Sequence, residues 1–126
     1  MYEYKALVDR VVDGDTIDVT IDLGFKTWKK VRVRMEGINT PESRTRDLEE
    51  KKRGLAAKDR LVEILELNNN ECTLQVSGVG KFGRAIANIF VTSLSPTPED
   101  SSLTLINVNQ QLITEGHAVA YDGGKR

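Results

Sequence analysis

A regular alternation of apolar and polar residues between Thr16 and Leu23 constrains the fold more than any other feature of the chain. Such a period of two is the pattern of a β-strand with one buried face. Residues 28–36 alternate in the same way, with Val31, Val33 and Met35 on one face and Lys30, Arg32, Arg34 and Glu36 on the other. We therefore expect two half-buried strands, with Arg34 pointing away from the core.

Further elements are predicted along the rest of the chain. They are strands over residues 5–12, 71–77 and 84–91, a glycine-rich turn at 78–80, and helices over 47–67 and 105–115. The first helix repeats apolar residues at helical spacing, and Asp47 with Glu50 resembles a capping box at its start. Gly116 is expected to end the second helix.

These elements follow the order three strands, helix, two strands, helix. Because strands and helices do not alternate, a doubly wound parallel sheet is disfavoured. The order is typical of a small Greek-key barrel, so the sequence predicts an α+β, mainly β protein. We expect a five-stranded barrel of the OB type with two packed helices. Residues 1–126 are expected to form a single domain, with a polar loop at 92–102 and a short tail at 122–126.

The composition excludes several classes of protein. The 126 residues include one cysteine, Cys72, so there is no internal disulfide and no cysteine-based zinc cluster. We expect Cys72 to be a small buried hydrophobe. No apolar stretch approaches the roughly 18–20 residues that span a bilayer, so no membrane partner is expected. Residues 1–5 do not resemble a signal peptide, which favours a cytoplasmic protein, or a secreted one if the chain is a processed form. A monomer is also expected.

Charge is distributed unevenly along the chain. The formal net charge is −1, yet residues 26–60 hold 12 Lys/Arg against 6 Asp/Glu, a local net of +6. A basic segment on an acidic protein suits a polyanionic partner. A solvated helix face beside a charged strand face explains the same count, and charge alone favours this second interpretation.

Two short motifs offer oxygen atoms to a cation. In Asp13-Gly14-Asp15-Thr16 two carboxylates flank a glycine, and in Asn39-Thr40-Pro41-Glu42 an amide, a backbone carbonyl and a carboxylate lie in a loop stiffened by proline. Oxygen ligands of this kind suit a hard divalent ion. Each motif taken alone is also an ordinary turn sequence.

Two arginines lie near these motifs in the predicted fold. Arg34 precedes Asn39 by five residues, and Arg84 closes the segment Lys81-Phe82-Gly83-Arg84. The planar fork of donors on arginine matches phosphate oxygens. Two arginines, a glutamate and a cluster of oxygen ligands are the components of metal-assisted phosphoryl chemistry.

Together these motifs resemble the staphylococcal (micrococcal) nuclease family, the thermonuclease-like domains, over residues 5–121. The resemblance implies an OB-fold barrel that uses Ca²⁺ to hydrolyse DNA and RNA phosphodiesters and leaves 3′-phosphate ends. It implies that Asp15, Asn39 and the carbonyl of Thr40 hold the metal, with Asp13 close behind. Glu42 becomes the general base, and Arg34 and Arg84 become the residues that grip the phosphate. Lys81, Phe82 and Tyr121 match positions that contact the nucleotide.

The chain departs from the family pattern at two of these positions. The best-known member has aspartate where Asn39 stands and tyrosine where Phe82 stands. Because fewer charged ligands lower calcium affinity, we expect a weak metal site. We expect single-stranded DNA and RNA as substrates, with Lys26, Lys29, Lys30 and Arg32 tracking the phosphate backbone.

Three interpretations follow from the sequence. The first is an active nuclease. The second is a non-catalytic OB-fold module that binds nucleic acid or acts as a scaffold, and the third is a protein-interaction domain with decayed catalysis. The only histidine, His117, is expected to be a surface or packing residue rather than a base.

Overall fold

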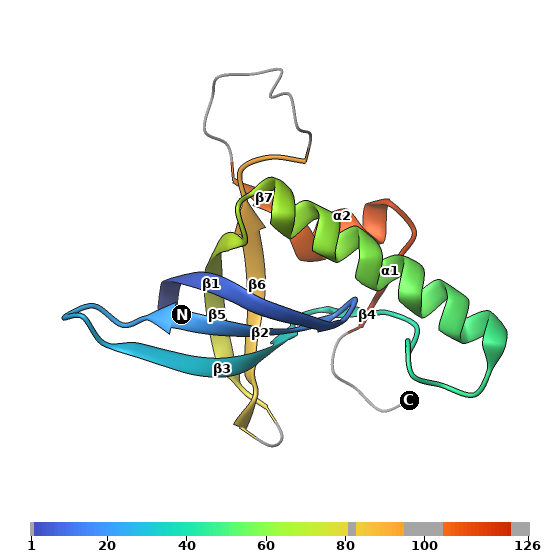
Figure 1. Ribbon diagram of the computed structural model, residues 1–126, viewed down its shortest axis with the longest axis horizontal. Helices are drawn as coiled ribbons and strands as arrows, with labels where there is room; N and C mark the ends of the chain where they lie inside the picture. Colours follow the sequence, from blue (N-terminus) through green and yellow to red (C-terminus); the bar gives the residue numbers. More distant parts are fainter. Residues whose placement is uncertain (1, 81–82, 95–104, 122–126) are drawn as a thin grey trace.

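Five strands close into a barrel in the computed structural model, which describes residues 2–80, 83–94 and 105–121 (Figure 1). The barrel strands are β1 (Tyr2–Asp13), β2 (Thr16–Asp22), β3 (Trp28–Met35), β5 (Glu71–Val79) and β6 (Ala85–Val91). They are hydrogen-bonded in the order β3-β2-β1-β5-β6, and a parallel pairing of β3 with β6 closes the ring. With two helices packed against it, the barrel confirms the predicted OB-type fold class.

The core fills the inside of this barrel and confirms the alternation in the sequence. Strand β2 buries Ile17, Val19 and Ile21. Its neighbour β3 buries Val33 and Met35 on the same inner face of the sheet. The prediction is wrong at its end, because β2 stops at Asp22 and Leu23 is exposed. The backbone N–H of Leu23 instead donates to the carbonyl of Thr27, 2.9 Å away, and closes the turn that leads into β3.

Helix α1 (Leu48–Leu67) lies across the barrel and packs against β1 (Figure 1). Its buried face includes the predicted residues Ala57, Leu61, Ile64 and Leu65. The side chain of Asp47 caps the helix by accepting from the N–H groups of Glu49 and Glu50. The reciprocal half of the predicted capping box is absent, since a carboxylate oxygen of Glu50 accepts from the N–H of Glu42 at 3.3 Å.

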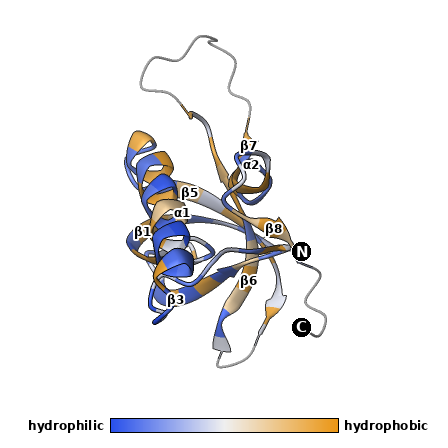
Figure 2. Cartoon of the chain, turned by 90° about the vertical axis from the view of Figure 1, so that its right-hand side faces the viewer, coloured by the Kyte–Doolittle hydropathy of each residue, from blue (hydrophilic) through white to orange (hydrophobic). Residues whose placement is uncertain are grey.

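The second helix, α2 (Val108–Thr114), packs beside β6 and is shorter than predicted (Figure 2). Residues Ile106–Asn107 form strand β7, which pairs with β6, so the expected start at residue 105 is wrong. Asn107 then caps α2 by accepting from the N–H of Gln110. Gly116 follows the helix in a left-handed conformation with φ of 83°, as expected for a stop signal.

Two further strands lie where the sequence predicts none. Strand β4 (Ile38–Asn39) pairs with β8 (Val119–Ala120), and neither segment shows a strand pattern in the sequence. The turn predicted at residues 78–80 is also displaced, because β5 continues to Val79. The predicted polar loop lies mostly, and the tail at 122–126 entirely, outside the described residues.

Cys72 is buried in the core, as expected of a small hydrophobe. Burial raises the pKa of its thiol to about 12, so the group stays protonated at neutral pH. No helix among the described residues is long and apolar enough to cross a membrane.

Candidate active site

A buried carboxylate anchors the site at the turn between β1 and β2. Asp15 is only 8% exposed, and its two oxygens have separate partners. One accepts from the hydroxyl of Thr16 at 2.9 Å, and the other accepts from the backbone N–H of Thr40 at 3.0 Å. Because a buried charge without partners is costly, these bonds fix Asp15 and tie the β1–β2 turn to the loop after β4.

Arg34 lies beside this carboxylate on the outer face of β3, as the alternation predicts. Its Nη2 is 3.5 Å from Oδ2 of Asp15 and donates to Oδ1 of Asn39 at 3.3 Å. Its Nη1 donates to the carbonyl of Met35 at 3.0 Å. The guanidinium is therefore held by several partners with its side chain about one-fifth exposed, an arrangement that keeps a positive charge at the edge of the cleft.

The loop after β4 presents Glu42 to solvent while its backbone is held in place. The pairing of Asn39 with Val119 fixes the start of the loop. The hydroxyl of Ser43 makes a hydrogen bond to the carboxylate of Asp13, and the carboxylate of Glu50 accepts from the N–H of Glu42. The Glu42 side chain is thus exposed on a fixed backbone, a geometry that suits a residue acting on a bound molecule.

Two glycines let this loop, the β1–β2 turn and α1 approach one another closely. A Cβ on Gly14 would lie 2.8 Å from Cβ of Ala57, and a Cβ on Gly54 would lie 2.3 Å from the carbonyl oxygen of Glu42. Both distances are shorter than real contacts allow, so any larger residue would move its neighbour. Gly54 was missed in the sequence, where a glycine inside a helical pattern is the available signal.

Arg84 directly precedes β6, the strand that closes the barrel, and lines the same site. The N–H of Gly80, directly after the end of β5, donates to the carbonyl of Arg84 at 2.7 Å. Since Arg34 is paired with Ile86 across the parallel seam, Arg84 lies two residues earlier on the same outer face. The predicted substrate residues Lys81 and Phe82 lie outside the described residues.

The segment after α2 forms the remaining wall. The N–H of Tyr121 donates to the carbonyl of Gly37 at 2.8 Å, which extends the β4–β8 pairing. His117 is partly buried there, and its backbone N–H donates to the carbonyl of Leu112. The structure thus places Tyr121 and His117 beside a loop that is some eighty positions away in the sequence.

These elements enclose a cleft of about 1100 Å³. Its lining includes every predicted site residue that the structure describes, namely Asp13, Asp15, Arg34, Asn39, Thr40, Glu42, Arg84 and Tyr121. It also includes three ionisable residues that were not predicted to belong to the site: Glu50, Arg53 and His117. Residues from six separate segments therefore meet in one open cavity.

The oxygen atoms in this cleft suit a hard divalent cation. The carboxylate of Asp15 and the amide oxygen of Asn39 both lie within 3.5 Å of Nη2 of Arg34, and the N–H of Thr40 donates to the same carboxylate. The buried hydroxyl of Thr40 has no hydrogen-bond partner among the described atoms. The described residues contain no cluster of three or more His, Cys, Asp or Glu side chains that could hold a metal. The donor set fits Ca²⁺ chemically but supplies little negative charge, which is typical of a weak site.

A small OB-type barrel with an open cleft of arginines, carboxylates and oxygen ligands defines a class of domain suited to phosphate chemistry. Comparison with known families agrees, because residues 32–126 match the model of the family described as staphylococcal nuclease homologue. The chain belongs to this family.

Relatives of similar sequence include two proteins whose names state a nuclease. The chain is 28% identical over 119 residues to the micrococcal nuclease of Shigella flexneri, covering 94% of this chain and 59% of that protein. It is 29% identical over 126 residues to endonuclease YhcR of Bacillus subtilis (strain 168), covering 94% of this chain and 9% of that protein. Protein ParB of Escherichia coli is 29% identical over 123 residues, with 94% and 58% covered. The chain spans under two thirds of each relative.

Proposed function

We propose that this chain is a metal-dependent nuclease that hydrolyses phosphodiester bonds of DNA and RNA, with single strands favoured and 3′-phosphate products. The observation behind the proposal is the placing of Glu42, Arg34 and Arg84 around one cleft beside the oxygen atoms of Asp15, Asn39 and Thr40. Membership of the nuclease family and the names of two relatives support it.

Each residue has a physical role in this proposal. Arg34 and Arg84 bind the non-bridging oxygens of the phosphate, and their donors stabilise the extra negative charge of the transition state. Glu42 accepts a proton from the attacking water or orients it. A bound Ca²⁺ supplies further charge stabilisation at the phosphate. Asp15, Asn39 and Thr40 would hold that ion, and Asp13 keeps the loop in place through Ser43.

A second candidate function has one specific observation in its favour. The guanidinium of Arg34 lies against Asp15 and Asn39, two of the three proposed metal ligands, and Asn39 has no charge to oppose it. An arginine that opposes the metal ion still attracts phosphates. On this alternative the domain binds nucleic acid without cutting it.

A cleavage assay separates the two functions. Labelled single-stranded and duplex DNA is incubated with calcium from micromolar to tens of millimolar, with EDTA as the control. The Glu42→Gln variant is expected to lose roughly 10²–10⁴-fold in rate, as general base catalysis typically contributes. Glu66→Gln, on an exposed position of α1 away from the cleft, is the matched control and should cut normally. Binding without product at any calcium level would instead establish the non-catalytic module.

A further inference from the structure

The turn between β2 and β3 exposes an unusual group of apolar side chains at residues 23–30, called here the hairpin tip. Phe25 is fully exposed, Trp28 is 55% exposed, and Leu23 is also exposed. Single exposed apolar residues are common on protein surfaces, but two aromatic rings within four positions form a patch. The hairpin tip therefore offers flat apolar surfaces to a ligand.

The backbone of the hairpin tip is held in one conformation. Phe25 and Lys26 both have left-handed φ angles, 53° and 59°, which residues other than glycine seldom adopt. The N–H of Thr27 donates to the carbonyl of Gly24 at 2.9 Å, and a carboxylate oxygen of Asp22 accepts from the N–H of Gly24 at 2.8 Å. The ring of Phe25 is thus presented outward by a turn with its own hydrogen bonds.

Three lysines lie within two positions of one of the two aromatic residues in the sequence. Lys26, Lys29 and Lys30 are exposed, and no ion pair to them is found within the described ranges. Arg32 differs, because Asp18 accepts from its Nε at 2.8 Å and neutralises its charge. Unpaired lysines beside aromatic rings are the combination that binds single-stranded nucleic acid, in which bases stack and phosphates attract cations.

The hairpin tip is continuous with the candidate active site along β3. Trp28, Lys30, Arg32 and Arg34 occupy alternate positions and so lie on the same outer face of the strand. Trp28 and Arg34 are six positions apart, roughly 20 Å at about 3.3 Å per residue. Figure 1 shows the hairpin tip at the left end of the molecule and the loop before α1 at the right end.

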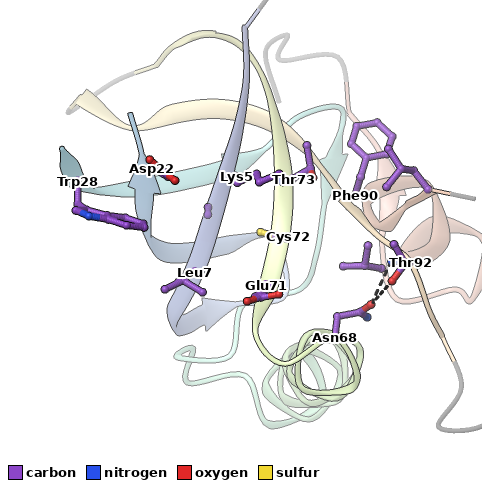
Figure 3. A pocket seen from close by; sticks show the side chains of 13 residues that line it. Lys5, Leu7, Asp22, Trp28, Asn68, Glu71, Cys72, Thr73, Phe90 and Thr92 are labelled. Carbon is purple, nitrogen blue, oxygen red and sulfur yellow. Dashed lines mark hydrogen bonds between the residues drawn. The ribbon is translucent and has the colours of Figure 1, made fainter. Parts of the chain in front are cut away.

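Trp28 also borders a second cavity, of about 460 Å³, on the outside of the barrel. Figure 3 shows its indole ring at one side of this cavity, near Asp22 and on the side away from Phe90. Leu7 and Lys5 of β1 line the cavity between the rings of Trp28 and Phe90. A base stacked on Trp28 therefore has room beside it, with a further lysine within the same cavity.

We propose that the hairpin tip is an accessory binding site for single-stranded nucleic acid, with bases stacked on Phe25 and Trp28 and phosphates bound by Lys26, Lys29 and Lys30. The inference rests on the proposed nucleic-acid substrate and assigns it a second contact far from the bond that is cut. Aromatic rings beside lysines would also suit a lipid surface. The cavity beside Trp28, and the position of Lys30 on the face of β3 that leads to Arg34 in the cleft, favour nucleic acid.

Trp28 is the only tryptophan of the chain, so its fluorescence reports on the hairpin tip directly. The full chain in EDTA is titrated with oligothymidylate of about 12 nucleotides, a length within the range bound by OB folds. We expect quenching of Trp28 and weaker binding as salt rises. Phe25→Ala should weaken binding roughly 5- to 100-fold, the range for loss of one stacked base. Leu48→Ala removes an exposed apolar side chain at the start of α1, away from the hairpin tip, and should leave the affinity unchanged.

Two outcomes would overturn the proposal. One is an unchanged Trp28 signal with the oligonucleotide, or equal affinity for wild type and Phe25→Ala. The other is a blue shift of Trp28 with phosphatidylserine vesicles and no response to the oligonucleotide, which would make the hairpin tip a membrane contact. Because EDTA prevents calcium-dependent cleavage, quenching without cleavage in a separate calcium assay would refute the nuclease and keep the accessory site.

Discussion

Gly54 of helix α1 lies directly against the backbone of Glu42, so close that a Cβ atom on the glycine would be 2.3 Å from the Glu42 carbonyl oxygen and 2.7 Å from the nitrogen of Ser43. The helix is thus the surface on which the proposed catalytic loop rests. Glycine destabilises a helix interior by roughly 1 kcal/mol relative to alanine. That cost is offset here because only glycine permits the close approach.

Gly54→Ala is therefore expected to destabilise the protein despite the better helix propensity of alanine. The added methyl group must push the Glu42 backbone away, which costs more than the roughly 1 kcal/mol that alanine gains. Thermal unfolding should show a lower Tm, and nuclease activity should fall with it. Ala56→Gly, at an exposed position of the same helix, is the control and should lower the Tm by propensity alone. A more stable and fully active Gly54→Ala would contradict the close packing.

Replacing Asn39 by aspartate should strengthen calcium binding. The amide oxygen of Asn39 already faces Arg34 at 3.3 Å, so a carboxylate there would add a charged ligand without a new clash. Calorimetric titration should give a lower Kd for Asn39→Asp than for wild type, and Asn39→Ala should bind more weakly than either. Tight binding by wild type that Asn39→Asp does not improve would show that the ion is held elsewhere.

The hydroxyl groups of Thr40 and Thr16 make a matched pair for mutation to valine. Thr40 has a buried hydroxyl without a described partner, whereas the Thr16 hydroxyl donates to Asp15 at 2.9 Å. In metal-free buffer Thr40→Val should be neutral or stabilising by up to about 1 kcal/mol, and Thr16→Val should cost about 1–2 kcal/mol. Urea unfolding measures both. A large loss for Thr40→Val would reveal a water molecule or other partner on the hydroxyl.

An ion pair between the two helices should make stability depend on pH. The Nε and Nη2 atoms of Arg60 on α1 donate to the carboxylate of Glu115, at 2.6 and 2.8 Å. These hydrogen bonds lower the pKa of Glu115 below its usual range. The pair therefore stabilises the fold fully above about pH 4.3, the usual pKa of glutamate, and is lost as pH falls through the lower, folded-state pKa.

The measurement is the unfolding free energy of Glu115→Gln relative to wild type across this pH range. At neutral pH the variant should be less stable by about 1 kcal/mol, since the pair is only partly buried. The difference should shrink as the pH falls below about 4. Glu66→Gln should show a much smaller difference at either pH, because its exposed side chain has no described hydrogen bond or ion pair. A pH-independent difference would mean that Glu115 contributes by packing instead of charge.

The barrel was predictable because its signals are local. The alternation after Thr16 and the helical period after Asp47 each follow from burial of one face, and neither depends on distant residues. The prediction was wrong at Leu23, because this apolar residue lies in an exposed turn but continues the alternation beyond the end of the strand. Residues 106–107 were predicted as helix but form a strand, because their pairing with β6 outweighs their helical propensity.

The candidate site was predictable only in part. Motifs and family resemblance indicated Asp15, Arg34 and Glu42, and the structure brings these residues to one cleft. The pairing of β4 with β8 was not predictable, because two-residue strands show no periodicity and their partners are about eighty positions apart. Arg53 was missed for a different reason. The sequence pattern of a helix does not distinguish an exposed arginine that lines a cleft from one that faces only solvent.

The parallel seam between β3 and β6 has a consequence for folding. Only three residue pairs form it, Val33 with Ala85, Arg34 with Ile86 and Met35 with Ala87, and some fifty residues of chain separate the partners. Contacts of such long range form slowly, because the chain entropy lost in closing the loop precedes the gain. Only this seam brings Arg34 on β3 beside the start of β6, which Arg84 directly precedes. A nascent or partly unfolded chain with native hairpins but an open seam would therefore lack the pair of guanidinium groups, and recovery of phosphate binding during refolding would mark the moment at which the ring closes.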